Sequence, residues 1–536
     1  PPPGRLAALA AVLAAALLAV ALSGRAAAAA PAWLDGAWRF GRGACLRAWR
    51  GMARWERWSF ALLLAAGALT HLALRWPLLT DARTDLGGAE INVAYGIQKL
   101  LLGKPLYSDP ESPPFEVVQY TPLYHALCAA LCRVSGVDAM DTAGIFRASR
   151  ACCLALNLIA AALLLLLCRK LEAPAWIAMG AACLSLALMA PHFYGRPDAL
   201  ATPLMMGALL ALMSDRPATW PRAALGAMLA MLAVMAKQTA IVAPVIIAAH
   251  LALQRDSQGL KRSVACLSGF GTLALGALLA VAPPAVLWRN LVVSARNGMG
   301  FTLYRELADR GILKHWLGWM VLAALASIAL LRKGSAKERL AALGALIALA
   351  AGLAEGLKSG SGLNYLADGL LLGLAATCAW LARLRAPVRE AAAIAVLAFG
   401  ALFMQHRLRL LHGLAGSPAD RAAHEAALRA DRAVLAWLQD QWVDAAPAPV
   451  LVLYRGHLEL LLNGAGLLPP KDIIEWSARP PFALPGLERM LEQGAVAHCI
   501  AAAPIDSVRL PGWACGVEPL ARVESRYIYR PLPAQR

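Results

Sequence analysis

The sequence predicts an all-α polytopic membrane bundle of about eleven transmembrane helices, followed by a small C-terminal α/β domain outside the cytoplasm. Of its 536 residues, 60% are hydrophobic and only 16% are charged, a balance more apolar than that of soluble domains. The apolar residues recur in blocks of roughly 15 to 20, about the length that crosses the hydrocarbon as a helix. From residue 417 the composition turns hydrophilic, and strand-like and helix-like segments alternate, which is typical of an α/β domain.

Residues 1–58 form an Ala-rich and then basic segment whose nature the sequence leaves open. An apolar run over 6–22 is followed by AAAAAPA at 26–32. This pattern fits a signal peptide, one additional span, or an extension upstream of the true start. We favour Met52 as the natural start, because it opens MARWERW directly before a good span.

Residues 59–405 form the predicted transmembrane module. Helix is the expected spanning structure, because backbone amides in lipid must be satisfied within their own segment. The eleven apolar blocks cover 59–79, 150–168, 174–191, 199–213, 223–236, 240–253, 264–287, 316–331, 340–356, 365–382 and 389–405.

Short basic loops follow alternate blocks and indicate the cytoplasmic side of a bacterial inner membrane. The opposite side then holds the first external loop, 80–149, and the domain 406–536, which we expect in the periplasm. This topology requires that YHALCAALCRV (124–134) does not cross; it is too short for a span, so we expect a helix lying on the membrane. The basic loops are 168–173, 214–222, 254–262, 331–339 and 383–389.

The net charge of +18 and the eleven cysteines bear on whether the protein binds nucleic acid or metal. The charges sit in short clusters between apolar blocks, so membrane topology accounts for them and no nucleic-acid partner is expected. The cysteines lack metal-ligand spacing, and most lie in or beside apolar blocks, where they are expected to be small core residues. A disulfide between Cys499 and Cys515, both in the hydrophilic tail, is left open.

Acidic residues directly after the first span are the first candidates for chemistry. Asp85 and Glu90 precede a predicted amphipathic helix, Ile91 to Leu102, which ends at Gly103. Asp85 either caps this helix or supplies a carboxylate at the water–lipid boundary that can take a proton from a hydroxyl group.

The second external loop, HFYGRPDA (192–199), places two opposite charges beside the end of a span. Arg196 and Asp198 form either an anchoring ion pair or a second carboxylate with a guanidinium suited to phosphate. Lys237, between two apolar blocks at the same face, either snorkels or neutralises a membrane-borne phosphate. The loop 288–315 adds Arg289, and KSGSGLNY (358–365) adds Lys358, Asn364 and Tyr365.

These segments resemble the external loops of GT-C membrane glycosyltransferases, closest to family 39 and its bacterial relatives. That group includes protein O-mannosyltransferases and aminoarabinose–lipid A transferases. The resemblance covers 59–215, and more weakly 357–380. It is carried by Asp85, Glu90, LLLGKPLY (100–107), YTPLYH (120–125), HFYGRPDALATPLMM (192–206) and GSGLNY (360–365).

The resemblance implies inverting transfer of a sugar from a polyprenyl-phosphate donor to a lipid, glycan or protein acceptor on the periplasmic face, in contact with membrane lipids. Asp85 would be the base that activates the acceptor. Relatives often carry two acids in the second loop, where this chain has Asp198 alone; no metal ligands are therefore assigned, no cofactor is certain, and a divalent cation stays an open alternative. They also often carry KPPL where this chain has YTPL (120–123), so lipid A is not implied. The candidate residues are Asp85, Asp198 and Glu90 for catalysis, and Arg196, Lys237, Lys358, Arg289, Tyr120, His125, Asn364 and Tyr365 for substrate binding.

Two other classes of function compete with this interpretation. A transporter or flippase of lipid-linked saccharides would carry ionisable residues near the middle of the bilayer, whereas these spans are nearly charge-free at their centres. An assembly subunit whose tail binds partners would leave the loop acids without a role.

Overall fold

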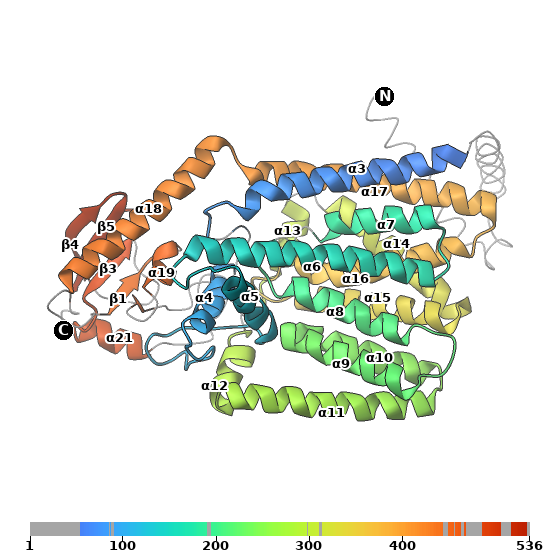
Figure 1. Ribbon diagram of the computed structural model, residues 1–536, viewed down its shortest axis with the longest axis horizontal. Coiled ribbons are helices and arrows are strands. Elements are labelled where there is room, and N and C mark those ends of the chain that lie inside the picture. The colour runs from blue at the N-terminus through green and yellow to red at the C-terminus, as the bar shows by residue number, and fades with distance from the viewer. Residues whose placement is uncertain are drawn as a thin grey trace.

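The structure is a computed structural model that describes residues 54–84, 86, 90–189, 194–296, 298–309, 313–442, 449–454, 456–462, 466–467, 485–504 and 516–532. Long helices lie side by side in a bundle, and a small domain with a β-sheet lies beyond one end of it (Figure 1). The three interpretations of the N-terminal segment fall on residues that are largely outside the described ones.

Each of the eleven predicted apolar blocks is helical in the structure. Six of the described helices are long and apolar enough to cross a membrane, which indicates a multi-pass protein, while the count of about eleven spans stays a prediction. The helices are α3 (Arg54–Leu79), α6 (Thr142–Lys170), α7 (Ala175–Leu188), α8 (Asp198–Leu212), α9 (Trp220–Ala236), α10 (Val242–Leu253), α11 (Ser257–Val281), α14 (Leu313–Lys333), α15 (Ala336–Glu355), α16 (Asn364–Ala382) and α17 (Ala386–Ala415).

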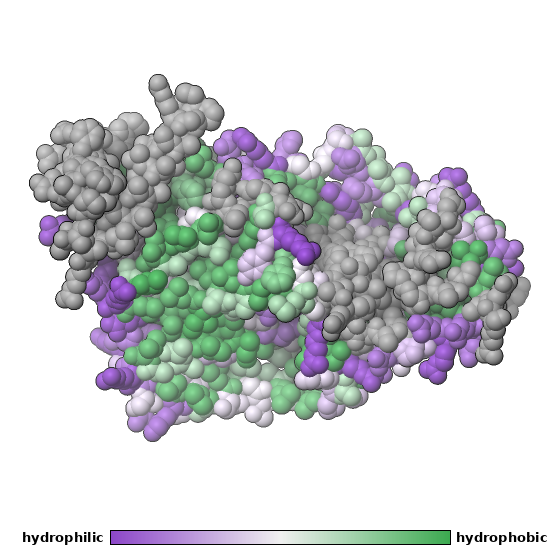
Figure 2. Space-filling view, turned by 180° about the vertical axis from the view of Figure 1, so that it is seen from behind, coloured by the Kyte–Doolittle hydropathy of each residue, from purple (hydrophilic) through white to green (hydrophobic). Residues whose placement is uncertain are grey.

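The outer surface of the bundle is apolar over a broad band, which Figure 2 shows in green. The exposed helix α11 contributes Leu273 and Leu275, whose exposed fractions are 69% and 55%. Such a continuous apolar surface would make a water-soluble protein aggregate, whereas lipid chains cover it without cost. The band is therefore the part of the surface that suits the bilayer.

Small residues let neighbouring helices approach closely inside the bundle. A Cβ atom on Gly352 of α15 would lie 2.2 Å from the carbonyl oxygen of Tyr365 on α16, and one on Gly369 would lie 2.6 Å from the amide nitrogen of Leu349. In a membrane, where no hydrophobic force drives helices together, such close packing is a main source of association. It also fixes the start of α16, which carries two of the candidate residues.

The basic loops lie together at the end of the bundle away from the C-terminal domain (Figure 1). Lys337 Nζ lies 2.5 Å from Glu172 Oε1 and 3.7 Å from Asp215 Oδ2. The amide of Ala218 donates to Asp256 Oδ2 at 2.9 Å. These contacts link four of the five loops expected to be cytoplasmic.

Cysteine labelling tests the predicted orientation. Ser135, after α5, and Ser257, at the start of α11, are both exposed and lie on loops assigned to opposite sides. We expect Ser135→Cys, but not Ser257→Cys, to react with a membrane-impermeant thiol reagent added to cells whose outer face alone is accessible. The parent protein gives the background from its native cysteines, and the reverse labelling pattern would overturn the topology.

The first external segment contains two short helices at the other end. The predicted helix 91–102 is α4 (Glu90–Leu101), followed closely by Gly103 with φ of +69°, a conformation that glycine adopts without strain. The predicted surface helix 124–134 is α5 (Leu123–Val134), whose 12 residues are too few to span a bilayer. Shorter elements here are η3 (Gln238–Ile241), α12 (Pro284–Trp288), η4 (Arg289–Val293) and α13 (Thr302–Asp309).

The small C-terminal α/β domain is present, and its sheet has the strand order β2-β1-β3-β5-β4. β1 pairs in parallel with β2 and β3, and β5 is antiparallel to β3 and β4. The elements are α18 (Pro418–Gln441), β1 (Val450–Val452), α19 (His457–Leu461), β2 (Gly466–Leu467), α21 (Pro485–Glu492), β3 (His498–Ala501), β4 (Gly516–Val523) and β5 (Arg526–Leu532).

The strand-like and helix-like segments expected after residue 417 correspond to α18, β1, α19, α21 and β3, whereas the hairpin of β4 and β5 was not expected. That hairpin turns at Glu524, whose φ is +53°, without the Gly or Asn that usually marks such a turn. The last span also continues further than expected: α17 runs to Ala415 rather than ending at 405, and Gly416 separates it from α18. Of the two cysteines in the tail, Cys499 is buried on β3 and Cys515 lies outside the described residues.

Candidate active site

Three candidate residues that are far apart in the sequence meet at one carboxylate oxygen. Lys237 Nζ donates to Asp198 Oδ1 at 2.6 Å, and Asn364 Nδ2 donates to the same oxygen at 2.8 Å. Arg196 Nε lies 3.5 Å from the other oxygen, Oδ2. All four side chains are buried, so the charges interact without the screening that water provides.

Local structure explains how Asp198 and Lys237 come to be there. Asp198 opens α8, where the positive end of the helix dipole stabilises a carboxylate. Lys237 has extended backbone (φ −153°, ψ 126°) and interrupts the path from α9 into η3. Thr121 Oγ1 donates to the carbonyl of Val234, just before this interruption, at 2.9 Å. Irregular backbone at membrane depth is tolerated where protein surrounds it, and it often marks a binding site.

The cations near Asp198 differ in how firmly they hold their protons. Burial is the largest single influence on Lys237 and lowers its pKa, but Asp198, Tyr365 and Tyr120 together outweigh it and hold that pKa above its ordinary value. Burial lowers the pKa of Lys358, and the nearby charges of Lys237 and Arg196 lower it further, against the opposing effect of Glu355. The Lys237 ammonium also lies 4.5 Å from the centre of the Tyr365 ring. Lys237 is therefore a fixed positive charge.

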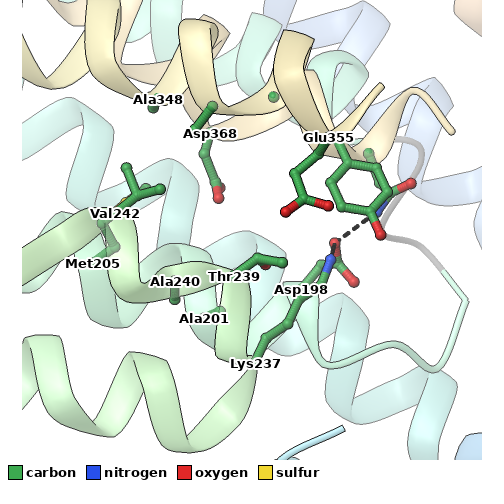
Figure 3. Close-up of a pocket in the computed structure, with 14 residues that line it drawn as sticks. Asp198, Ala201, Met205, Lys237, Thr239, Ala240, Val242, Ala348, Glu355 and Asp368 are labelled. Carbon is green, nitrogen blue, oxygen red and sulfur yellow. Dashed lines mark hydrogen bonds and ion pairs between the residues drawn. The ribbon is translucent and has the colours of Figure 1, made fainter. Parts of the chain in front are cut away.

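A pocket begins at this cluster. Figure 3 shows the carboxylates of Glu355 and Asp368 facing Lys237 and Thr239 across it. Thr202 donates to Asp368 Oδ1 at 2.6 Å. The rest of the lining is mostly apolar and comes from Ala201, Met205, Ala240, Val242, Ala348, Ala351 and Gly352. The lining therefore offers a ligand both polar and apolar contacts.

Glu90 occupies a different position, inside a buried ion pair with Arg150. Arg150 Nε donates to Glu90 Oε1 at 2.7 Å, and its Nη2 donates to Oε2 at 2.9 Å. The amides of Leu86 and Gly195 donate to the two oxygens of Glu90, each at 3.2 Å. Glu90 thus ties the segment after the first span to the second external loop. Arg150 was not among the predicted site residues; its only signal in the sequence is a charge at the first residue of a predicted span.

The ion pair gives a prediction about stability. Replacing Arg150 by Gln should leave the buried carboxylate of Glu90 without its cation and destabilise the protein by about 3–5 kcal/mol. The double variant Glu90→Gln with Arg150→Gln removes both charges and should lose clearly less. Thermal melting of the purified variants compares the two, and an equal loss in both would show that the charge pair itself contributes little.

Of the four remaining candidates, one belongs to the cluster, two do not, and one lies outside the described residues. Tyr120 lies close enough to Arg196 to affect it electrostatically, so it belongs to the cluster. Arg289 lies apart from the cluster, because it is partly exposed and pairs with Asp109 at 2.7 Å. His125 is buried beneath Gly96, on which a Cβ atom would lie 2.5 Å from the histidine ring, and it does not line the pocket. Asp85 lies outside the described residues.

Three basic side chains of α3 and α17 are buried: His71 and Arg75 of α3 are fully buried, and Arg407 of α17 is 7% exposed. Within the described part of the chain, no group of three or more His, Cys, Asp or Glu side chains could hold a metal ion. A divalent cation stays a prediction.

The helical bundle with a small α/β domain beyond one end has counterparts among solved structures. The sequence matches no protein-family model and no curated protein. Among solved structures, ArnT from Cupriavidus metallidurans bound to undecaprenyl phosphate is similar, with a TM-score of 0.56 and 14% identity over 88% of this chain and 98% of that chain.

The oligosaccharyltransferase of Archaeoglobus fulgidus has the same fold. Its complex with Zn and sulfate has a TM-score of 0.53 at 12% identity, over 82% of this chain and 68% of that chain. Archaeal oligosaccharyltransferase AglB from Archaeoglobus fulgidus, in complex with an inhibitory peptide and a dolichol-phosphate, has a TM-score of 0.51 at 11% identity, over 84% of this chain and 70% of that one. The resemblance seen in the sequence is thus confirmed at the level of the fold.

Proposed function

We propose that this protein is an integral membrane glycosyltransferase that moves a sugar from a polyprenyl-phosphate-linked donor to an acceptor on the periplasmic face. The observation that carries the proposal is the buried Lys237–Asp198 pair, with Arg196 beside it, at the mouth of a pocket in a GT-C fold. The structural neighbours support it, because one is bound to undecaprenyl phosphate and another to a dolichol-phosphate.

The cations act on the leaving group. In the transfer the acceptor oxygen bonds to the anomeric carbon while the bond from that carbon to the phosphate oxygen breaks, and polyprenyl phosphate leaves with a new negative charge. Lys237 and Arg196 stabilise this charge as it develops, and burial strengthens the effect because water is excluded. Burial lowers the pKa of Lys358, so among these three cations it is the one that most readily loses its proton.

The carboxylates have separate roles. Asp85 takes the proton of the acceptor hydroxyl and attack comes from the side opposite to the phosphate, so the configuration inverts. Asp198 orients Lys237 through the hydrogen bond of 2.6 Å. Glu90 acts as a positioning residue, because Arg150 and two backbone amides already occupy its oxygens.

The experiment that tests the proposal separates transfer from transport. Purified full-length protein in lipid vesicles is given a polyprenyl-phosphate sugar and candidate acceptors, and the release of polyprenyl phosphate is measured by mass spectrometry. A transferase consumes the donor and forms a glycosylated lipid, glycan or protein. A flippase of lipid-linked saccharides moves the donor across the bilayer and leaves it intact, and that result would replace the proposal.

A further inference from the structure

The chain between the first span and Asp85 is held from two sides at consecutive residues. Arg150 Nη1 donates to the carbonyl of Asp81 at 2.7 Å, and its Nη2 donates to the carbonyl of Arg83 at 2.5 Å. The carbonyl between them, that of Ala82, lies 2.6 Å from Nε2 of His457. In extended chain successive groups point to opposite sides. The helical bundle therefore holds the carbonyls of residues 81 and 83 by hydrogen bonds, and the C-terminal domain holds the carbonyl of residue 82 in the same way.

The geometry of His457 defines its protonation. A carbonyl oxygen only accepts hydrogen bonds, so Nε2 carries the proton and donates it to Ala82. Nδ1 is then the acceptor for the hydroxyl of Thr142, whose Oγ1 lies 2.6 Å away at the start of α6. The ring packs edge-on against Phe146 with centroids 5.7 Å apart, and the residue is 3% exposed. A single side chain thus joins the C-terminal domain, α6 and the segment that leads to Asp85.

His457 is also fixed within its own domain. Asp431 of α18 accepts hydrogen bonds from the amide of Leu458 at 3.1 Å and from Arg526 Nε of β5 at 2.7 Å. One turn on from His457, Leu460 is fully buried in the apolar cluster that α4, α5 and α6 form. Helix α19 is therefore anchored both to the sheet domain and to the bundle, and its position sets the position of Ala82.

We infer that the C-terminal domain is a working part of the active site, in which His457 positions the segment that carries Asp85. This inference rests on the proposed function for its effect on rate, but its structural part can be measured independently. Asp85 follows Ala82 by three residues, and a misplacement of about 1 Å in a catalytic group costs about 10²-fold in rate. Glycosyl transfer should therefore depend on a residue that never contacts the sugar.

Three variants separate positioning from general damage to the domain. His457→Phe keeps a ring against Phe146 but loses both hydrogen bonds. His457→Gln retains one donor and one acceptor. Leu491→Ala, a matched control, removes a side chain that is 2% exposed in an apolar cluster that the domain forms with Phe115 and Val117, and that contains none of residues 81–83.

The measurements are amide hydrogen exchange over residues 81–90 and the kinetics of transfer, both on the full-length protein. We expect His457→Phe to speed exchange in this segment about tenfold or more and to lower kcat about 10–100-fold, with the KM for the donor within about twofold. His457→Gln should recover most of both losses, and Leu491→Ala should show neither. Unchanged exchange in His457→Phe, or equal effects in Leu491→Ala, would overturn the inference. Faster exchange in a protein that catalyses no transfer in any variant would instead leave the positioning intact and remove the proposed function.

Discussion

Asp85→Asn should reduce sugar transfer by about 10²–10⁴-fold, the usual contribution of a general base, while the protein still folds and inserts into the membrane. Asparagine has nearly the same shape as aspartate but cannot accept the proton of the acceptor hydroxyl. The rate is measured as release of polyprenyl phosphate from the donor by purified protein. Donor binding should persist, because the cations proposed to bind the phosphate are unchanged.

Asp138→Asn is the matched control for this experiment. Asp138 is an exposed acid of the same external segment, and its Oδ1 accepts the amide of Met140 at 2.7 Å, a bond that asparagine can also make. We expect parental activity in this variant, together with melting temperatures for both variants close to that of the parent. Full activity in Asp85→Asn would remove Asp85 from the mechanism and leave the base to be sought elsewhere.

Replacing Lys237 by Met should have the second large effect, on both activity and stability. The substitution keeps the length and apolar stem of the side chain but leaves Asp198 buried without its closest cation, which costs about 3–5 kcal/mol. Removing a positive charge that acts on the departing phosphate should also lower kcat by about 10²–10³-fold. Thermal melting and donor turnover measure the two effects separately.

The double variant Lys237→Met with Asp198→Asn distinguishes structure from catalysis. It removes both charges, so we expect much of the stability to return while transfer stays low. Lys337→Met, in the basic loops at the far end of the bundle, serves as the control and should change stability by no more than about 1 kcal/mol without slowing transfer. Recovery of transfer together with stability in the double variant would show that Lys237 has only a structural role.

Hydropathy alone located the helices of this protein because lipid imposes a strong constraint on every spanning segment. All eleven predicted blocks are helical, and α4, α5 and most of the C-terminal domain also follow from local patterns. The hairpin of β4 and β5 did not, because its turn is made by Glu524 rather than by a residue with a clear turn signal. The end of α17 was also missed, since the helix continues to Ala415 past the apolar residues.

The candidate site was predictable in its members and less so in their roles. Topology alone indicated that Arg196, Asp198, Lys237 and Asn364 would gather at one end, and they do. Partners that depend on tertiary packing could not be read from the sequence. Arg150 is 60 positions from Glu90, and nothing local indicates that the two form an ion pair. In the same way, nothing near Arg289 in the sequence indicates that it pairs with Asp109 and not with the cluster.

The break in the helical path at Lys237 limits how this protein can be recombined with others. Thr121 donates a hydrogen bond to the carbonyl of Val234, and Gln238 donates to the carbonyl of Gln119 at 2.7 Å, so the segment 80–149 is bonded directly to the helical bundle. A chimera that exchanges 80–149 for the equivalent segment of a structural neighbour would remove these partners of the break. A transplanted segment must therefore keep both hydrogen bonds, the one from position 121 to Val234 and the one from Gln238 to position 119.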